Sequence, residues 1–200
     1  MNILALIASL ILALLLAGFL YLAWCGLFAK VPVEERDAGP FLLVYKKHTG
    51  DYKNIGSVTD QVYYTLRDEY RIETTRGFGL YYDNPQEVRK ADLRSIGGCI
   101  VDGLTPEEFN RRYPGVSESF GVALFPASRN VMAVHPYRGK ASIILGVLRV
   151  YPQFQAWMKK YKRRSVPVME IYDTPSRTIT YLAAVGVPDS IYQNLLNQGT

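Results

Sequence analysis

The chain has 200 residues, of which 48% are hydrophobic, and it carries a formal net charge of +5. This length suits one globular domain plus an additional element, and two cysteines are too few for a disulfide framework. The basic side chains form one cluster rather than a stripe, so we expect no direct binding of nucleic acid.

The first predicted element is a transmembrane helix. Residues 1–29 contain no charged side chain, and residues 3–28 are almost wholly apolar. A helix needs about 20 such residues to cross a bilayer. A cleaved signal peptide is the alternative, but it normally has a charged start and a shorter apolar core. Residues 1–29 are therefore predicted to be a retained membrane anchor, with Tyr21 and Trp24 at the membrane interface.

The charges around this anchor predict its orientation. Lysines follow the apolar segment and none precedes it, which favours a cytosolic C-terminal domain. The sequence contains no Asn-x-Ser/Thr glycosylation site. Cys99 also has no partner within the predicted domain, as a reducing compartment would allow.

Residues 30–40 are predicted to be a short polar linker that ends in Gly-Pro. The domain that follows, residues 41–187, divides into halves at about 41–102 and 120–187. The first half reads as a β-α-β-β unit, because alternating apolar runs flank one segment with helical spacing. Its elements are expected at residues 41–46, 55–69, 77–82 and 92–101.

The second half repeats this order. A strand at 130–135 precedes some twenty residues with helical spacing, and strands at 166–172 and 178–185 follow. Residues 188–200 are interpreted as a tail. The predicted fold class is thus α+β: a transmembrane helix, then a duplicated β-α-β-β domain with a curved, mostly antiparallel sheet and helices on one side.

A short internal similarity supports the duplication. Tyr-Tyr-Asp-Asn-Pro, which ends at Pro85, resembles Ile-Tyr-Asp-Thr-Pro, which ends at Pro175. This overlay aligns Tyr82 with Tyr172, and Leu80 with Glu170. A ligand pocket is expected on the concave face of the sheet, between the two halves.

Glu170 is the principal candidate ligand-binding residue, because it places a carboxylate inside an apolar strand. A carboxylate in an apolar, aromatic pocket attracts a desolvated cation. Tyr172 shares its face of the strand, while Tyr82 and Trp157 are further aromatic candidates. The alternative is that Glu170 lies on the solvated face of a half-exposed strand.

A basic cluster follows the second helical segment. It is expected either to complement the helix dipole or to contact anionic lipid or an acidic partner. Its members are Lys159, Lys160, Lys162, Arg163 and Arg164.

The two histidines and two cysteines are widely separated and show no metal-ligand spacing. No phosphate-binding loop or nucleophile elbow is present. The sequence therefore predicts no metal, no cofactor and no catalytic residues, and a binding protein rather than an enzyme.

Several segments carry a resemblance to a known family. They are the leading apolar segment, Val44-Tyr45-Lys46 with His48 and Gly50, residues 81–85 (Tyr-Tyr-Asp-Asn-Pro), residues 125–128 (Phe-Pro-Ala-Ser) and residues 170–172 (Glu-Ile-Tyr). With these segments in this order along the sequence, the chain resembles the gyrase-inhibitor-like (GyrI-like) small-molecule-binding family. With its anchor it is similar to a narrower group, the testis-expressed ER-phagy receptors.

This resemblance implies a single-pass protein of the endoplasmic reticulum (ER) membrane with a cytosolic domain. It implies an adaptor role in selective autophagy of the ER and recruitment of the p97 segregase to topoisomerase adducts. Tyr192 and Leu195 form an aromatic-x-x-Leu pattern, a possible motif for binding autophagy modifiers. The alternatives are an anchored sensor of small cationic molecules and, less favoured, a small-molecule hydrolase.

Overall fold

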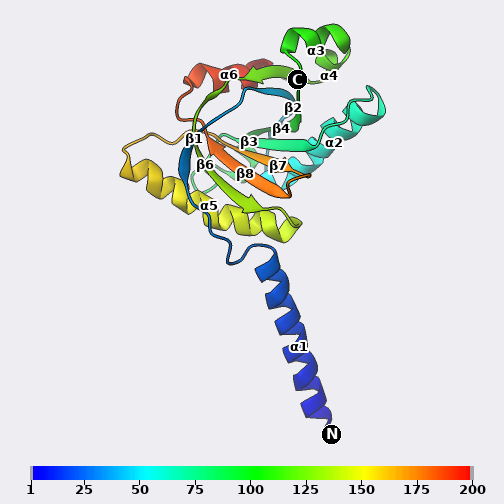
Figure 1. Cartoon of the computed structure of the whole chain (residues 1–200), viewed down its shortest axis with the longest axis vertical. Helices are drawn as coiled ribbons and strands as arrows, with labels where there is room; N and C mark the ends of the chain where they lie inside the picture. Colours follow the sequence, from blue (N-terminus) through cyan, green and yellow to red (C-terminus); the bar gives the residue numbers. More distant parts are fainter. Residues whose placement is uncertain (1, 199–200) are drawn as a thin grey trace.

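The computed structural model describes residues 2–198 and begins with one long helix, α1 (Ile3–Trp24), which extends away from the rest of the chain (Figure 1). Asn2 caps this helix, because its side chain accepts a hydrogen bond from the amide of Leu4. Every residue of α1 is at least partly exposed. By length and composition α1 could cross a membrane, so the predicted N-terminal apolar helix is confirmed.

The domain is built on a curled antiparallel sheet of eight strands, in the order β1-β6-β8-β7-β3-β4-β2-β5. The strands are β1 (Glu34–Ala38), β2 (Phe41–Thr49), β3 (Arg76–Tyr81), β4 (Arg94–Val101), β5 (Gly121–Phe125), β6 (Ser128–Pro136), β7 (Val168–Asp173) and β8 (Thr178–Ala183). The two halves join at the centre of the sheet, where β3 pairs with β7 and Gly79 lies opposite Glu170.

Helices cover both faces of this sheet. α2 (Ile55–Asp68) and α5 (Lys140–Lys160) lie on one face, each following the first strand of its half, so the predicted duplicated β-α-β-β order is confirmed. α6 (Asp189–Gln198) packs on the opposite face, which corrects the expectation of helices on one side only. The remaining helices are η1 (Tyr52–Asn54), η2 (Lys90–Asp92), α3 (Pro106–Arg112) and α4 (Val116–Ser119).

Two segments that the sequence assigned to connections are regular elements. Residues 34–38 form the edge strand β1, which pairs with β6 from Glu34↔Met132 to Ala38↔Ser128. Its charged side chains point to solvent, as is common at a sheet edge. The expected linker 30–40 is therefore wrong over these residues, and the expected tail 188–200 contains α6.

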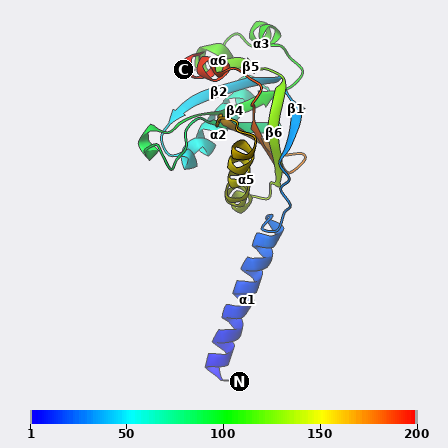
Figure 2. The same cartoon turned by 90° about the vertical axis from the view of Figure 1, so that its left-hand side faces the viewer.

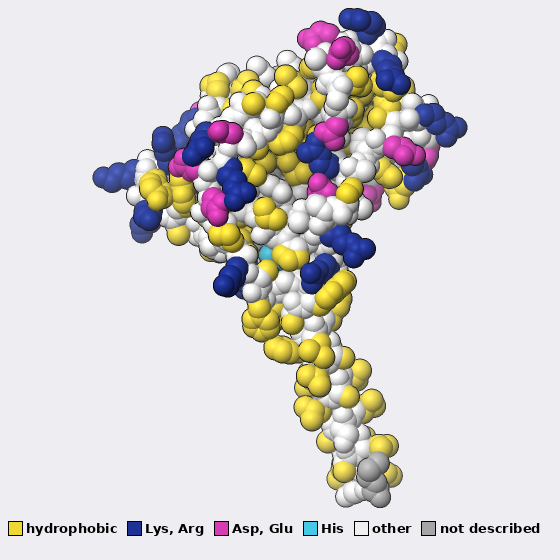
Figure 3. Space-filling model, viewed as in Figure 1, with side chains coloured by type: hydrophobic (Ala, Val, Ile, Leu, Met, Phe, Trp, Pro, Cys, Tyr) yellow, Lys and Arg dark blue, Asp and Glu magenta, His cyan; other side chains and the backbone are white. Residues whose placement is uncertain are grey.

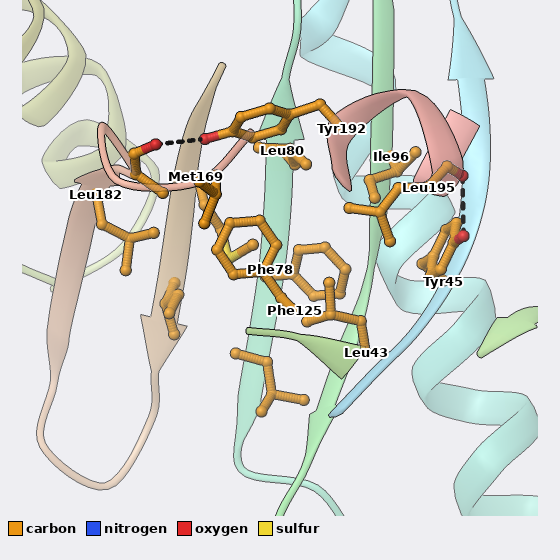
Figure 4. Packing of buried hydrophobic residues seen from close by; sticks show 14 residues of the cluster. Leu43, Tyr45, Phe78, Leu80, Ile96, Phe125, Met169, Leu182, Tyr192 and Leu195 are labelled. Carbon is orange, nitrogen blue, oxygen red and sulfur yellow. Dashed lines mark hydrogen bonds between the residues drawn. The ribbon is translucent and has the colours of Figure 1, made fainter. Parts of the chain in front are cut away.

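The core beneath α6 depends on alternation along the strands. Phe78 and Leu80 of β3, with Met169 of β7, point to the α6 face and pack around Tyr192 and Leu195 (Figure 4). Hydrogen bonds complete this packing: the Tyr45 hydroxyl donates to the Leu195 carbonyl at 2.8 Å, and the Tyr192 hydroxyl donates to the Ala184 carbonyl at 3.2 Å. Burial of each large side chain contributes about 1.5–3 kcal/mol.

Candidate ligand-binding cleft

A cleft of about 1740 Å³ lies between α2 and α5, over the central strands β3 and β7. Its floor includes Gly77 and Gly79 of β3, and the lack of a side chain at these positions lets Thr59 and Tyr81 approach the backbone closely. The walls come from both halves of the domain, including Thr59 of α2 and Val147 of α5. The cleft therefore lies between the two halves, at the strand pair that joins them.

Glu170 lies on the floor of this cleft and is only 2% exposed. Strand alternation directs Glu170 and Tyr172 to the face of the sheet that α2 and α5 cover, while Met169 faces the core under α6. One carboxylate oxygen accepts a hydrogen bond from the Tyr151 hydroxyl at 2.8 Å, and the other accepts from the Tyr172 hydroxyl at 2.5 Å. Two phenols thus hold the carboxyl group in a defined orientation.

Burial dominates the electrostatics of this group. It raises the pKa of Glu170 to about 7, although the two tyrosine hydrogen bonds act in the opposite direction. Burial, followed by the nearby Glu170 charge, raises the pKa of Tyr151 and Tyr172 well above the usual value for tyrosine. Both phenols therefore stay protonated near neutral pH and remain hydrogen-bond donors.

Further aromatic rings surround the carboxyl group. Tyr181 of β8 lies directly across from Glu170 in the sheet, and its ring meets that of Tyr151 edge-on, with centroids 6.1 Å apart. A Cβ atom on Gly79 would lie 2.8 Å from the Tyr81 hydroxyl, so Tyr81 extends over the glycine that pairs with Glu170. A carboxylate among aromatic faces can bind a desolvated cation.

The predicted ligand-binding residues separate into two groups. Glu170 and Tyr172 lie together in the cleft. Tyr82 reaches the edge of the cleft, but its hydroxyl donates to the Tyr192 carbonyl of α6 at 3.0 Å. Trp157 stacks on Tyr161 with ring centroids 4.6 Å apart and does not line the cleft, so its assignment to the ligand site is corrected.

Sequence reasoning missed Tyr81 and Tyr151, which complete the aromatic surroundings of Glu170. The internal overlay aligned Glu170 with Leu80, yet Leu80 faces the core under α6. Gly79, which pairs with Glu170, is the residue of β3 that lies on the same side of the sheet as Glu170. Alternate residues of a strand share a face, so Tyr81 and Gly79 were recognisable from the sequence as residues of the same face of β3.

The residues of the basic cluster have different surroundings. Lys159 and Arg163 line one end of the cleft, and Lys160 lies over the Tyr161 ring, 5.1 Å from its centroid. Arg164 forms an ion pair with Asp189 at the start of α6. Lipid or partner contact by this cluster stays a prediction.

Tyr192 and Leu195 do not form an accessible peptide motif. Both side chains are 2% exposed and belong to the core under α6. An autophagy modifier would have to bind these two side chains, and α6 buries them against the sheet. The motif predicted from the sequence is therefore wrong for this fold, because the apolar face of an amphipathic helix has the same spacing.

Within residues 2–198, no group of three or more His, Cys, Asp or Glu side chains is arranged to hold a metal ion. The cleft lining carries exposed acidic and basic side chains, among them Asp60, Glu73 and Lys159, but Glu170 is the charged group of the cleft that is buried in the described residues, and phenols hydrogen-bond to it.

This architecture, a curled sheet whose two β-α-β-β halves enclose a cleft with a buried glutamate, is that of a small-molecule-binding domain. The model of the GyrI-like small molecule binding domain matches residues 32–185, and the chain therefore belongs to this family. Among curated proteins it is similar to Testis-expressed protein 264 of Homo sapiens, with 30% identity over 177 residues that cover 84% of this chain and 53% of the relative.

The Mus musculus homolog of that protein is 30% identical over 138 residues, which cover 65% of this chain and 41% of the relative. The chain thus spans about half the length of the curated relatives it matches. Among solved structures, EcmrR in its complex with DNA shares the fold with a TM-score of 0.54 and 12% identity. The likeness covers 77% of this chain and 57% of EcmrR.

Proposed function

We propose that this protein is a membrane-tethered binding protein whose cleft takes up a small lipophilic cation. The observation that carries the proposal is the buried Glu170, held by two tyrosine hydroxyls. Within residues 2–198 no ion pair joins it to a basic side chain. A buried carboxylate without a cation is unfavourable, so the cleft is suited to a ligand that supplies the positive charge.

The same geometry supports binding rather than turnover. Both oxygens of Glu170 already accept hydrogen bonds from Tyr151 and Tyr172. The raised pKa of each phenol keeps its proton in place. We propose that a bound cation lowers the pKa of Glu170, so that the carboxylate ionises as the ligand enters. The tyrosine rings then add cation–π contacts of about 0.5–2 kcal/mol each.

The Glu170→Gln substitution keeps the size of the side chain and removes the charge. We expect it to weaken binding of a quaternary aromatic ammonium ion at pH 8 by about 1.5–3 kcal/mol, or about 10- to 150-fold. Titration calorimetry on the full chain in detergent micelles measures this change, with a neutral ligand of the same shape for comparison.

Glu107→Gln is the matched control, because Glu107 is an exposed glutamate at the start of α3. It should leave cation affinity unchanged. Equal affinity of wild type and Glu170→Gln for the cation, or equal preference for the neutral ligand, would assign Glu170 a purely structural role.

The likeness to Testis-expressed protein 264 over 84% of the chain favours a second role. We propose that α1 anchors the protein in the ER membrane with the domain in the cytosol, as an adaptor in selective autophagy of the ER. Autophagy modifiers and p97 are the partners that the resemblance implies. Because Tyr192 and Leu195 are buried, modifier binding would need a segment other than α6.

The proposed anchor and orientation predict the behaviour of the chain in microsomes. Sodium carbonate should leave the full chain in the membrane pellet, since α1 is apolar over its whole length. Protease added to intact microsomes should digest the domain, and a lumenal marker protein should remain protected. Full protection of the domain would place it in the lumen and would contradict the proposed cytosolic partners.

A further inference from the structure

The last turn of α1 contacts the loop between β6 and α5. The Arg138 guanidinium donates a hydrogen bond to the Trp24 carbonyl and lies over the Trp24 ring, 5.2 Å from its centroid. A Cβ atom on the neighbouring Gly139 would lie 3.9 Å from the Tyr21 hydroxyl. Residues 138 and 139, immediately before α5, therefore lie beside Tyr21 and Trp24.

The connection after α1 is also attached to the domain. Arg149 of α5 donates hydrogen bonds to the carbonyls of Leu27 at 2.6 Å and Ala29 at 2.7 Å. A Cβ atom on Gly26 would lie 2.7 Å from Cε1 of His135, so this backbone packs directly on the buried histidine. These contacts hold the domain in one orientation on α1, in contrast to a domain on a free tether.

α5 runs crosswise to α1 along the side of the domain that α1 enters (Figures 1 and 2). Its first turns carry an exposed apolar stripe, formed by Ile144, Val147 and Leu148. Ile144 and Leu148 are 61% and 66% exposed. They are four residues apart, so they lie on the same face of the helix. Within residues 2–198 no protein segment covers this stripe.

Basic side chains lie beside the stripe. Lys140 begins α5, and Arg138 and Arg177 share a shallow hollow with Trp24 next to the end of α1. Figure 3 shows Lys and Arg side chains gathered where the apolar surface of α1 meets the domain. A helix with an apolar face and flanking cations is typical of segments that lie in the membrane interface.

We infer that the α5 stripe, with Arg138, Lys140 and Arg177, rests on the anionic lipid surface of the bilayer into which α1 inserts. This inference depends on the membrane anchoring proposed above. Tyr21 and Trp24 are side chains that favour the headgroup region. Because Gly139 lies beside Tyr21, α5 starts at that depth, and its orientation along the domain brings the stripe to the same surface.

This contact has a consequence for the ligand. Lys140, Ile144, Val147 and Leu148 also line the cleft that contains Glu170. One entrance of the cleft therefore opens at the headgroup layer. The ligand class that fits this entrance is an amphiphile that partitions into the membrane, with a cationic group that reaches Glu170.

Spin labels on the full chain in nanodiscs containing anionic phospholipid test the contact. One nitroxide is attached to an introduced cysteine at Leu148 or at Leu124, and the two sites form a matched pair because both are exposed leucines. The native Cys25 and Cys99 are buried and should not react with the label. Leu124 is 44% exposed on β5, at the end of the domain away from α1 (Figure 2). A label at Leu12, in the middle of α1, verifies insertion.

We expect the Leu148 label to lose access to a water-soluble nickel chelate and to gain access to oxygen, as the Leu12 label does. The Leu124 label should stay open to the chelate. Arg177→Glu should return part of the chelate access at Leu148. Chelate access at Leu148 equal to that at Leu124, with Leu12 protected, would overturn the inference and leave the anchor and the cation site intact. An unprotected Leu12 label would overturn both the anchor and the contact.

Discussion

Raising the pH from about 4.5 to about 7 should lower the contribution of Glu170 to the free energy of unfolding by about 3 kcal/mol. Burial raises the pKa of this carboxyl from 4.5 to about 7 in the folded protein. The folded state therefore holds the proton more tightly than the unfolded state. The associated stability is fully present below pH 4.5 and is lost as the pH rises to about 7, at 1.36 kcal/mol per pH unit.

The difference between wild type and Glu170→Gln isolates this contribution. The two proteins should have similar unfolding free energies near pH 4, because glutamine resembles the protonated acid in shape. Near pH 8 the variant should be more stable by about 3 kcal/mol. Urea unfolding of the full chain in detergent, followed by circular dichroism from pH 4 to pH 8, measures the difference.

Glu107→Gln is again the control and should follow the wild-type profile. Other groups titrate over the same range: the buried His135, whose pKa burial lowers, has the opposite trend with pH. The comparison of variants removes such shared terms. A difference between wild type and Glu170→Gln that does not depend on pH would contradict a buried, protonated Glu170.

Leu195→Ala should destabilise the domain by about 2–5 kcal/mol, the usual cost of truncating a buried leucine. Leu195 is 2% exposed and packs with Tyr192 against the central strands. Its carbonyl accepts the Tyr45 hydroxyl, which ties α6 to β2. Truncation leaves a cavity between α6 and the sheet, and thermal or urea unfolding of the full chain measures the loss.

Asn194→Ala is the matched control, because Asn194 is the exposed neighbour on the same helix. Its replacement by alanine should change stability by less than about 0.5 kcal/mol, as is usual for exposed positions. If Leu195→Ala had no larger effect than Asn194→Ala, Leu195 would be accessible, and its role as part of a partner-binding motif would be open again.

The sequence by itself determined the elements that depend on local pattern. An uncharged apolar segment predicts α1 in any context, because its length matches a bilayer. Alternating and helical spacings predicted the two β-α-β-β units. Glu170 was recognisable because a carboxylate in an apolar strand requires compensation wherever it is buried. Each of these features is a property of a continuous segment.

Only the tertiary structure decided which neighbours these segments meet. Residues 34–38, of which four are charged, have no strand signal, and they become β1 because β6 offers a free edge. The spacing of Tyr192 and Leu195 suits both a linear motif and an amphipathic helix, and the uncovered face of the sheet decided in favour of burial. Tyr151, which lies on α5 and 19 residues before Glu170 in the chain, donates a hydrogen bond to its carboxylate. Such a contact depends on how helix and sheet pack, because side chains that are distant in sequence come together only through the fold.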